Sequence, residues 1–189
     1  MTEQVVHTGP HLASEKLNGR YRFAAGEELA WLRGMASLLQ PGAKVAIVGG
    51  PFGIVPLALL EGVRARICLQ LVNRQECLAA AVTALKEAGR YAQAELSLIG
   101  PGEVFDGPVD VLIVDADTSA PVTEWAIRTP VVDEGLVYVR HYTYAMTSRA
   151  GRRMEVKDVV DRFLKPPDWK MTVRVASAAG FRLYPEVPG

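Results

Sequence analysis

The stretch KVAIVGGPFGIVPLALL, residues 44–60, decides the fold. Small and branched apolar residues at 44–48 predict a buried strand, and the apolar run at 54–60 predicts a helix. Between them stand three glycines, Gly49, Gly50 and Gly53. Such a turn at the carboxyl end of a first strand lets a ligand approach the backbone and the N-terminus of the next helix. Alternatively, the glycines only allow the strand and the helix to pack closely.

Strand and helix patterns alternate along the rest of the chain. Further strands are expected at residues 66–72, 96–99, 109–114 and 135–139, and helices at 27–39, 75–88, 122–128 and 154–163. This alternation predicts a parallel sheet with right-handed crossovers. Residues 171–187 read instead as two strands joined at 178–180, which are close enough only for an antiparallel pair. The predicted fold is α/β: a doubly wound, mainly parallel Rossmann-like sheet that ends in an antiparallel β-hairpin.

Length and composition indicate one ordinary globular domain. The chain has 189 residues, of which 49% are hydrophobic and 22% charged, so neither disorder nor a fibrous repeat is expected. We assign the domain to residues 26–189 and treat residues 1–25 as an N-terminal arm, irregular or forming a short helix. Residues 140–189 hold 10 Lys and Arg against 5 Asp and Glu. Such an excess is typical of a solvated face, so nucleic-acid binding is not favoured.

Cysteine use and hydropathy indicate a cytoplasmic protein. Cys68 and Cys77 have no partner at a metal-binding or CxxC spacing, which is typical of reduced core cysteines. The first residues lack a secretory signal pattern, and no run of about 18 apolar residues occurs, so membrane insertion is not expected. The expected partner is a small-molecule ligand, and a homodimer is compatible with the sequence.

One possible ligand is a nicotinamide dinucleotide. The glycines at 49–53 are similar to the turn of short-chain dehydrogenases, and Asn73-Arg74 would suit a 2′-phosphate. That family needs a Tyr-x-x-x-Lys pair, but neither Tyr142 nor Tyr144 is followed by lysine four residues later. A phosphate-binding P-loop is excluded as well, because no Gly-Lys-Ser/Thr follows the glycines.

The order of motifs resembles the class I S-adenosylmethionine-dependent methyltransferases, in particular small-molecule O-methyltransferases of the caffeoyl-CoA and catechol type. The resemblance covers about residues 25–187. It rests on the glycine motif at 45–53, the helix at 76–89, VDAD at 114–117 and the closing hairpin at 171–187. It implies that S-adenosylmethionine is the cofactor, and the implied cofactor-binding residues are Gly49, Gly50, Phe52, Gly53, Gln70, Asn73 and Gly100.

Acidic side chains that this family uses to hold its cofactor are missing. Carboxylates accept strong hydrogen bonds from the aminoacyl group, the ribose hydroxyls and the adenine amino group. The three aligned positions hold Ile47, Val72 and Pro101. Losing three charged hydrogen bonds, each about 1.5–3 kcal/mol, would weaken binding by several orders of magnitude unless other groups replace them. The available replacements are Gln70, Asn73 and Glu103.

The resemblance also marks candidate catalytic residues. Asp115 matches the first ligand of a magnesium site, but Arg140-His141 replaces the acidic pair expected after the fifth strand. Because arginine repels a cation that needs oxygen ligands, we predict no catalytic metal. Asp115 could instead cap the next helix. His141 is a candidate general base, or a solvated loop residue.

Two tyrosines complete the predicted site. Tyr142 and Tyr144 follow His141 and either line a substrate pocket or pack at its rim.

Three functions follow from these observations. The first is a metal-independent methyltransferase that acts on a small-molecule oxygen or nitrogen nucleophile, chiefly through positioning. The second is a pseudo-methyltransferase that has lost S-adenosylmethionine binding and serves as a partner subunit or binds another ligand. The third, an NADP-dependent reductase, is the least supported, because the residues it needs are absent.

Overall fold

The computed structural model describes residues 12–22, 24–50, 53–100, 103, 107–142 and 150–184, with side chains from residue 155 onward in the last range. Phe52, Pro101 and Tyr144, which the sequence analysis singled out, lie outside these ranges.

The described residues form one seven-stranded sheet in the order β3-β2-β1-β4-β5-β7-β6. Strands β1 to β5 pair in parallel, whereas β7 pairs antiparallel with both β5 and β6. This arrangement confirms the predicted doubly wound sheet with a closing hairpin. The strands are β1 (Lys44–Val48), β2 (Ile67–Val72), β3 (Ala94–Ile99), β4 (Val109–Asp115), β5 (Val131–Arg140), β6 (Trp169–Val175) and β7 (Ala178–Leu183).

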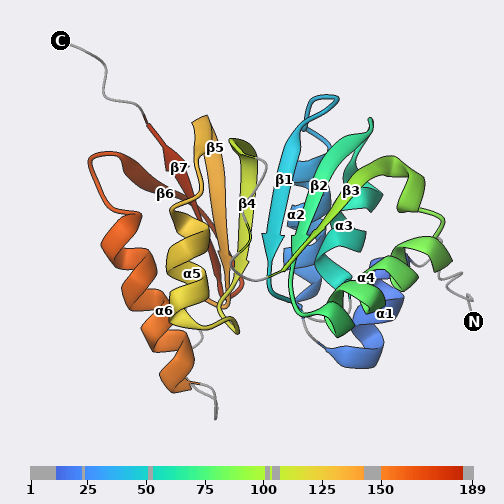
Figure 1. Ribbon diagram of the computed structural model, residues 1–189, viewed down its shortest axis with the longest axis horizontal. Helices are drawn as coiled ribbons and strands as arrows, with labels where there is room; N and C mark the ends of the chain where they lie inside the picture. The colour runs from blue at the N-terminus through green and yellow to red at the C-terminus, as the bar shows by residue number, and fades with distance from the viewer. Residues whose placement is uncertain are drawn as a thin grey trace, which may run out of the picture.

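Helices cover the two halves of the sheet differently. Figure 1 shows α5 and α6 together beside the half that carries β4 to β7, while α1 to α4 gather at the half that carries β1 to β3. The helices of the described residues are α1 (Ala13–Tyr21), α2 (Gly26–Ala36), α3 (Ile54–Gly62), α4 (Gln75–Glu87), α5 (Ala120–Ile127) and α6 (Ala150–Phe163), with a 3₁₀ turn, η1, at Tyr91–Gln93.

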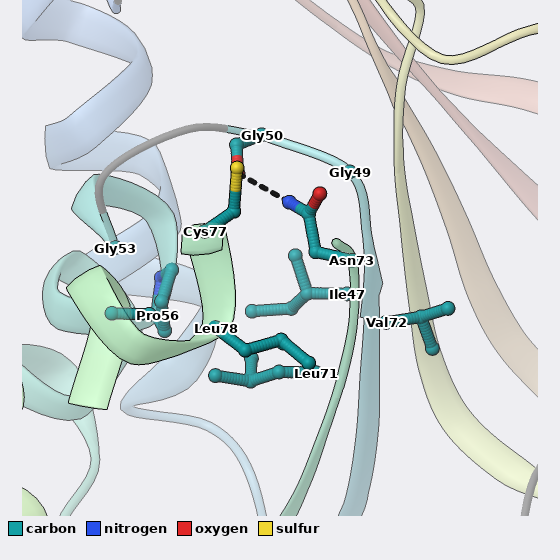
Figure 2. Close-up of a pocket in the computed structure, with 11 residues that line it drawn as sticks. Ile47, Gly49, Gly50, Gly53, Pro56, Leu71, Val72, Asn73, Cys77 and Leu78 are labelled. Atoms are coloured by element: carbon teal, nitrogen blue, oxygen red, sulfur yellow. Dashed lines mark hydrogen bonds between the residues drawn. The ribbon is translucent and has the colours of Figure 1, made fainter. Parts of the chain in front are cut away.

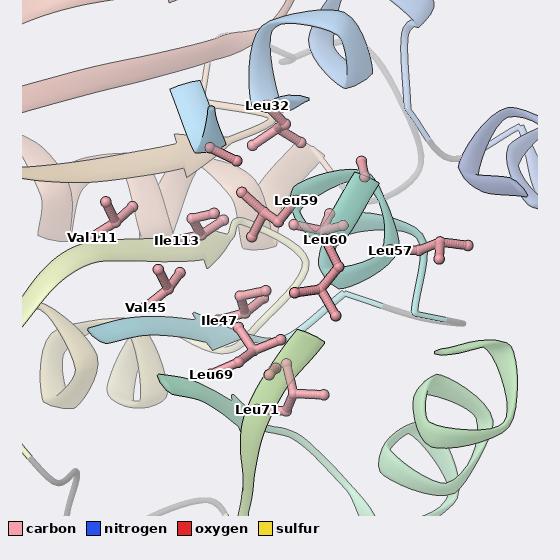
Figure 3. Packing of buried hydrophobic residues seen from close by; sticks show 14 of the residues in the cluster. Leu32, Val45, Ile47, Leu57, Leu59, Leu60, Leu69, Leu71, Val111 and Ile113 are labelled. Atoms are coloured by element: carbon pink, nitrogen blue, oxygen red, sulfur yellow. The ribbon is translucent and has the colours of Figure 1, made fainter. Parts of the chain in front are cut away.

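Strand β1 lies inside the sheet, between β2 and β4, and is buried on both faces. Its alternating side chains divide between two cores: Val45 and Ile47 pack toward α2 and α3, and Ala46 and Val48 pack toward the α5 and α6 side. Figure 3 shows the first core, where the strand residues meet leucines of α2 and α3. A strand that is buried on both faces needs a continuous apolar run, which explains the sequence at 44–48.

The turn of the hairpin is displaced from its predicted place at 178–180. It lies at Ala176, whose φ is 51°, and at Ser177, while the three predicted turn residues belong to β7. Gly180 was taken as a turn glycine, but a Cβ there would approach Val173 Cβ to 3.1 Å and Leu136 Cδ1 to 3.2 Å. Its small size therefore serves close packing inside the sheet rather than a turn.

Two further boundaries differ from the sequence prediction. Strand β5 extends to Arg140, so this arginine belongs to the sheet and not to the loop after it. Within the N-terminal arm, residues 13–21 form a helix, α1, whose Ser14 donates hydrogen bonds through its amide and hydroxyl to the Glu61 carboxylate of α3. Of the two possibilities for the arm, a short helix is the one that the structure contains.

No helix within the described ranges is long and apolar enough to span a bilayer.

Two helix glycines make a test of how closely α2 and α3 pack. A Cβ on Gly62 would lie 2.2 Å from the Arg33 carbonyl oxygen, whereas a Cβ on Gly34 would meet nothing within 4 Å. We expect Gly62→Ala to lower the free energy of unfolding by about 1–3 kcal/mol through overpacking. Gly34→Ala, the matched control, should raise it by about 0.5–1 kcal/mol through helix propensity. Urea denaturation measures both, and equal effects would contradict the packing.

Candidate functional site

The three glycines of the β1–α3 turn differ in how closely other residues pack against them. All have positive φ, 81° for Gly49, 78° for Gly50 and 73° for Gly53, so all three favour glycine. A Cβ on Gly49 would lie 2.4 Å from Thr118 Cγ2, and one on Gly53 would lie 2.7 Å from the Cα of Ala81 in α4. Both are therefore required by packing. Of the two explanations that the sequence left open, close packing therefore holds for Gly49 and Gly53.

Gly50 is the one member of this trio where a Cβ would not clash with the described residues. Its nearest neighbours among them would be the Asp115 Oδ2 atom at 3.6 Å and the Arg140 Nη1 atom at 3.9 Å, both ordinary van der Waals contacts. Helix α3 begins a few residues later, and no described side chain caps its N-terminus. Open backbone next to an uncapped helix start can receive a polar ligand group. Gly50 is thus the part of the turn that suits a ligand.

A small pocket lies under the turn, between the ends of β1 and β2 and helix α4 (Figure 2). Its volume is about 20 Å³, room for about one water molecule. The described residues that line it are glycines, apolar side chains, one cysteine and one asparagine: Ile47, Gly49, Gly50, Gly53, Pro56, Leu71, Val72, Asn73, Cys77, Leu78 and Ala81. No carboxylate is among them, so this pocket offers no charged acceptor to ribose hydroxyls.

Asn73 holds the turn in place. Its Nδ2 donates to the Gly50 carbonyl oxygen at 2.8 Å, as the dashed line in Figure 2 marks, and its Oδ1 accepts from the Arg74 amide at 2.8 Å. The side chain proposed as a replacement for the ribose-binding acid is therefore already bonded within the chain. A ligand that uses Asn73 must share its oxygen or displace one of these bonds.

The other predicted cofactor residues lie at varied distances from the turn. Gln70 is only 3% exposed and pairs in register with Ala46 in the interior of β2, so it does not line the pocket. Gly100 follows β3 at the sheet edge, and its carbonyl accepts from the Glu103 amide at 3.1 Å. The structure brings Gly49, Gly50, Gly53 and Asn73 together, and it places Gly100 next to Ile99, whose carbonyl accepts from the Asn73 amide at 3.3 Å. Gln70 alone of these residues lies inside its strand, away from the turn.

A buried ion-pair network lies beside Gly50. The Arg140 side chain is buried, and its Nε and Nη2 atoms donate to the two Glu28 carboxylate oxygens at 2.7 and 3.2 Å. Its Nη1 donates to Asp115 Oδ2 at 2.8 Å. One guanidinium thereby links α2, β4 and β5.

The network keeps Arg140 charged. Burial by itself would lower the pKa of Arg140, but the Asp115 and Glu28 carboxylates favour the charged form and raise that pKa above its ordinary value. Breaking a buried pair strands the remaining charge, and this is far more costly than losing a surface pair.

Asp115 belongs to a second cluster on the same edge of the sheet. Ligand atoms of Asp115, Asp117 and His141 all lie within 4.8 Å of one another. His141 has a positive φ of 57°, and its Nδ1 lies 3.4 Å from the Ser177 hydroxyl in the hairpin turn. The structure thus gathers the two predicted catalytic residues, His141 and Asp115, and adds Asp117.

A divalent cation fits this cluster poorly. Asp115 already accepts from the Arg140 guanidinium through Oδ2 and from the Asp117 amide at 2.9 Å through Oδ1. A cation at Asp115 would lie next to a buried positive charge, which repels it. The expectation of no catalytic metal remains a prediction, and Arg140 supports it.

Asp115 does not cap the helix that follows. The N-cap of α5 is Ser119, and the Asp115 carboxylate instead bonds to Arg140 and to the Asp117 amide. The capping explanation was wrong because Asp115 ends β4 itself and is separated from α5 by a turn.

Tyr142 packs against α6 and does not line the pocket under the turn. Its hydroxyl donates to Asp161 at 2.5 Å, and its ring meets Phe181 edge-on with centroids 5.7 Å apart. Burial, together with the Asp161 carboxylate, raises the pKa of Tyr142. Of the two roles considered for this tyrosine, the geometry supports packing.

Glu28 is a site residue that sequence reasoning missed. It is 3% exposed and shares one helix stripe with Leu32 and Ala36, four and eight residues later. An acidic residue on the buried stripe of an amphipathic helix needs a charged partner, because an isolated buried carboxylate is costly. That pattern was readable from the sequence, although the identity of the partner was not.

We expect Arg140→Met to lower the free energy of unfolding by about 3–5 kcal/mol, because it leaves Glu28 and Asp115 buried without their cation. The control is Arg128→Met, which breaks the exposed pair with Glu124 and should cost about 1 kcal/mol or less. Guanidinium denaturation compares the two. A cost for Arg140→Met as small as that of the control would show that the buried pair does not stabilise the fold.

Two Tyr→Phe substitutions compare the loss of a hydroxyl that makes a hydrogen bond with the loss of one that does not. The Tyr138 ring is buried and stacks on Trp31 with centroids 4.4 Å apart, and its hydroxyl has no hydrogen-bond partner in the described part of the chain. Tyr138→Phe should therefore be neutral or stabilising. Tyr142→Phe, which loses the bond to Asp161, should cost about 1–3 kcal/mol.

The Tyr138 comparison also has a predicted pH dependence. Burial and the nearby Glu28 charge raise the pKa of Tyr138 above its ordinary 10, so the folded state keeps this proton when the unfolded chain releases it. Titration of Tyr138 therefore costs the folded state nothing below about pH 10. Above that pH the unfolded chain releases the proton and the folded chain does not, so the free energy of unfolding of the parent protein falls. Denaturation at rising alkaline pH should favour Tyr138→Phe increasingly over the parent protein. A constant difference would contradict the raised pKa.

The fold is that of solved methyltransferase structures. The cofactor-bound protein Rv0187 from MTB is 16% identical, with a TM-score of 0.68 over 97% of this chain and 94% of its own. The SAH-bound methyltransferase PaMTH1 of Podospora anserina is 16% identical, with a TM-score of 0.68 over 90% and 86%. The O-methyltransferase TomG of Streptomyces achromogenes, in complex with SAM, is 14% identical, with a TM-score of 0.64 over 95% and 92%.

No protein-family profile and no curated protein matches the sequence. The structural similarity, together with the mostly parallel sheet and the antiparallel hairpin that ends it, gives the chain the class I methyltransferase fold.

Proposed function

We propose that the protein is an S-adenosylmethionine-dependent methyltransferase that acts, without a metal, on an oxygen or nitrogen nucleophile of a small molecule. The observation that carries this proposal is the Gly50 position, where an added Cβ would lie within 4 Å of Asp115 and Arg140 without a clash, at the carboxyl edge of the sheet. Ligands of open α/β sheets bind at this edge. Asp115, which clusters with Asp117 and His141, is therefore next to this part of the turn.

The chain's own residues would supply positioning and a base. S-adenosylmethionine supplies an electrophilic methyl group when it is bound. The uncapped start of α3 and the Gly50 backbone would hold its polar end. His141 would accept the proton of the nucleophile, and the neighbouring Asp117 carboxylate would favour the protonated imidazole that results.

The pocket under the turn favours a second function, a pseudo-methyltransferase that no longer binds S-adenosylmethionine. Its volume is about 20 Å³, and Ile47 and Val72 line it where related enzymes place acids. Asn73, the polar replacement nearest to the turn, is engaged with Gly50 and Arg74. In this case the protein would be a partner subunit or would bind another ligand. A homodimer and a cytoplasmic location remain predictions from the sequence.

Isothermal titration with S-adenosylhomocysteine, with NADPH as the comparison ligand, distinguishes these functions. Binding of S-adenosylhomocysteine alone in the micromolar range supports the enzyme and justifies a search for methyl acceptors. Binding of NADPH alone would support the reductase. If neither ligand binds at millimolar concentration, the enzyme proposal is wrong and the pseudo-methyltransferase replaces it.

Two glycines with nearly the same backbone angle test where the cofactor lies. Gly50 has a φ of 78° and Gly42 a φ of 77°, and a Cβ on Gly42 meets nothing within 4 Å. Alanine should strain both turns equally, by about 1–3 kcal/mol. Only Gly50→Ala fills the space beside Asp115, so it should weaken S-adenosylhomocysteine binding by about tenfold or more, relative to Gly42→Ala. Equal affinities of the two variants would place the ligand elsewhere.

A further inference from the structure

We propose that the Arg140 guanidinium is a built-in cation that takes the place of a divalent metal beside Asp115 and keeps metal ions out of the cluster formed by Asp115, Asp117 and His141. The assignment rests on the contacts of Arg140 with Glu28 and Asp115 and on the position of the cluster next to them.

Without the arginine, the cluster has the donors of a cation site. Two carboxylates and one imidazole can bring ligand atoms within 4.8 Å of one another. Manganese accepts carboxylate oxygen and tolerates imidazole nitrogen, so this set would suit Mn²⁺. The donors are fixed near one another by the ends of β4 and β5.

With the arginine in place, the cluster is already neutralised in part. The Nη1 atom of Arg140 lies 2.8 Å from Asp115 Oδ2, which is the distance of a direct charged hydrogen bond. The contact is buried, where charges interact more strongly than in water. A metal ion bound to Asp115 would have to share this carboxylate with a fixed positive charge.

Glu28 explains why the arginine is held so firmly. Its two oxygens take up Nε and Nη2 of the guanidinium, both donors on the side away from Asp115. This two-point contact fixes the plane of the guanidinium and aims Nη1 at Asp115. The arrangement fills the charge role of a metal with a side chain that chelators cannot remove.

The inference is independent of the proposed function, because metal binding can be measured without cofactor or substrate. The probe is Mn²⁺, titrated into the full chain without a histidine tag and followed by the loss of the free Mn²⁺ signal in electron paramagnetic resonance. Arg140→Met and Arg140→Lys form the central comparison, since the two side chains have similar length and differ in charge. A failure of S-adenosylhomocysteine to bind would leave this comparison unaffected.

The parent protein and Arg140→Lys should show no specific Mn²⁺ binding. Arg140→Met should bind one Mn²⁺ about tenfold or more tightly than the parent protein. If Arg140→Met does not fold, Glu28→Gln/Arg140→Met decides the matter, because it also removes the carboxylate that would be left unpaired. Adding Asp115→Asn to the double variant should abolish the gain.

The exposed-arginine variant Arg128→Met controls for a general change in surface charge, and it should gain no binding. The proposal is overturned if the parent protein binds Mn²⁺ as tightly as the methionine variants. It is also overturned if neither methionine variant gains affinity, or if the gain survives Asp115→Asn.

Discussion

The contact on which the site depends is the buried guanidinium of Arg140 between Glu28 and Asp115. Glu28 lies 112 residues before Arg140 and Asp115 lies 25 residues before it, so one side chain joins a helix near the start of the chain to two central strands. The bonds run from the sheet to α2, the helix that also provides Trp31 to stack on Tyr138. Since none of these charges could remain buried alone, the three elements hold one another in place.

The bonds of Arg140 also limit which side chains at this edge of the sheet can act as an acid or a base. Asp115 has both carboxylate oxygens engaged within the chain, which makes it a poor candidate for acid–base work. The same guanidinium lies beside Gly50, where the turn has space. The Arg140 guanidinium, which disfavours a metal ion at Asp115, would therefore also contact a ligand bound at the glycine turn.

The glycine motif of the β1–α3 turn does not by itself indicate ligand binding. Gly49 and Gly53 are needed by the neighbouring side chain of Thr118 and the backbone of Ala81, whatever the turn binds. A sequence with this motif would keep two of its three glycines for packing alone. Gly50 is favoured by its positive φ and not by packing, and it is the turn glycine beside which a ligand is proposed, next to the start of α3.

Much of the fold could be predicted from the sequence, because the apolar runs and the glycine and proline positions that mark strands and helices are local signals. The parallel sheet and its closing hairpin are confirmed, and the location of the site at the strand ends stays a prediction. The hairpin turn was misplaced because Gly180 is small for a packing reason that only the neighbouring strands reveal.

The contacts of the site were harder to predict than the fold. The resemblance implied that Arg140-His141 stands where an acidic pair is expected, but the partner of Arg140, Glu28, is on a distant helix, and the pairing depends on tertiary structure. Tyr142 was placed near the substrate by its position after β5, yet its hydroxyl bonds to Asp161 of α6. Side-chain direction at a strand end is decided by the helices that pack there, and a single sequence does not give it.

A crystal structure of the protein grown with both S-adenosylhomocysteine and magnesium tests the central claim most directly. The account predicts that S-adenosylhomocysteine lies along the turn at Gly50, that Arg140 keeps its bonds to Glu28 and Asp115, and that no magnesium is bound at Asp115. Magnesium coordinated by Asp115 and His141, with the Arg140 side chain displaced from Asp115, would contradict it.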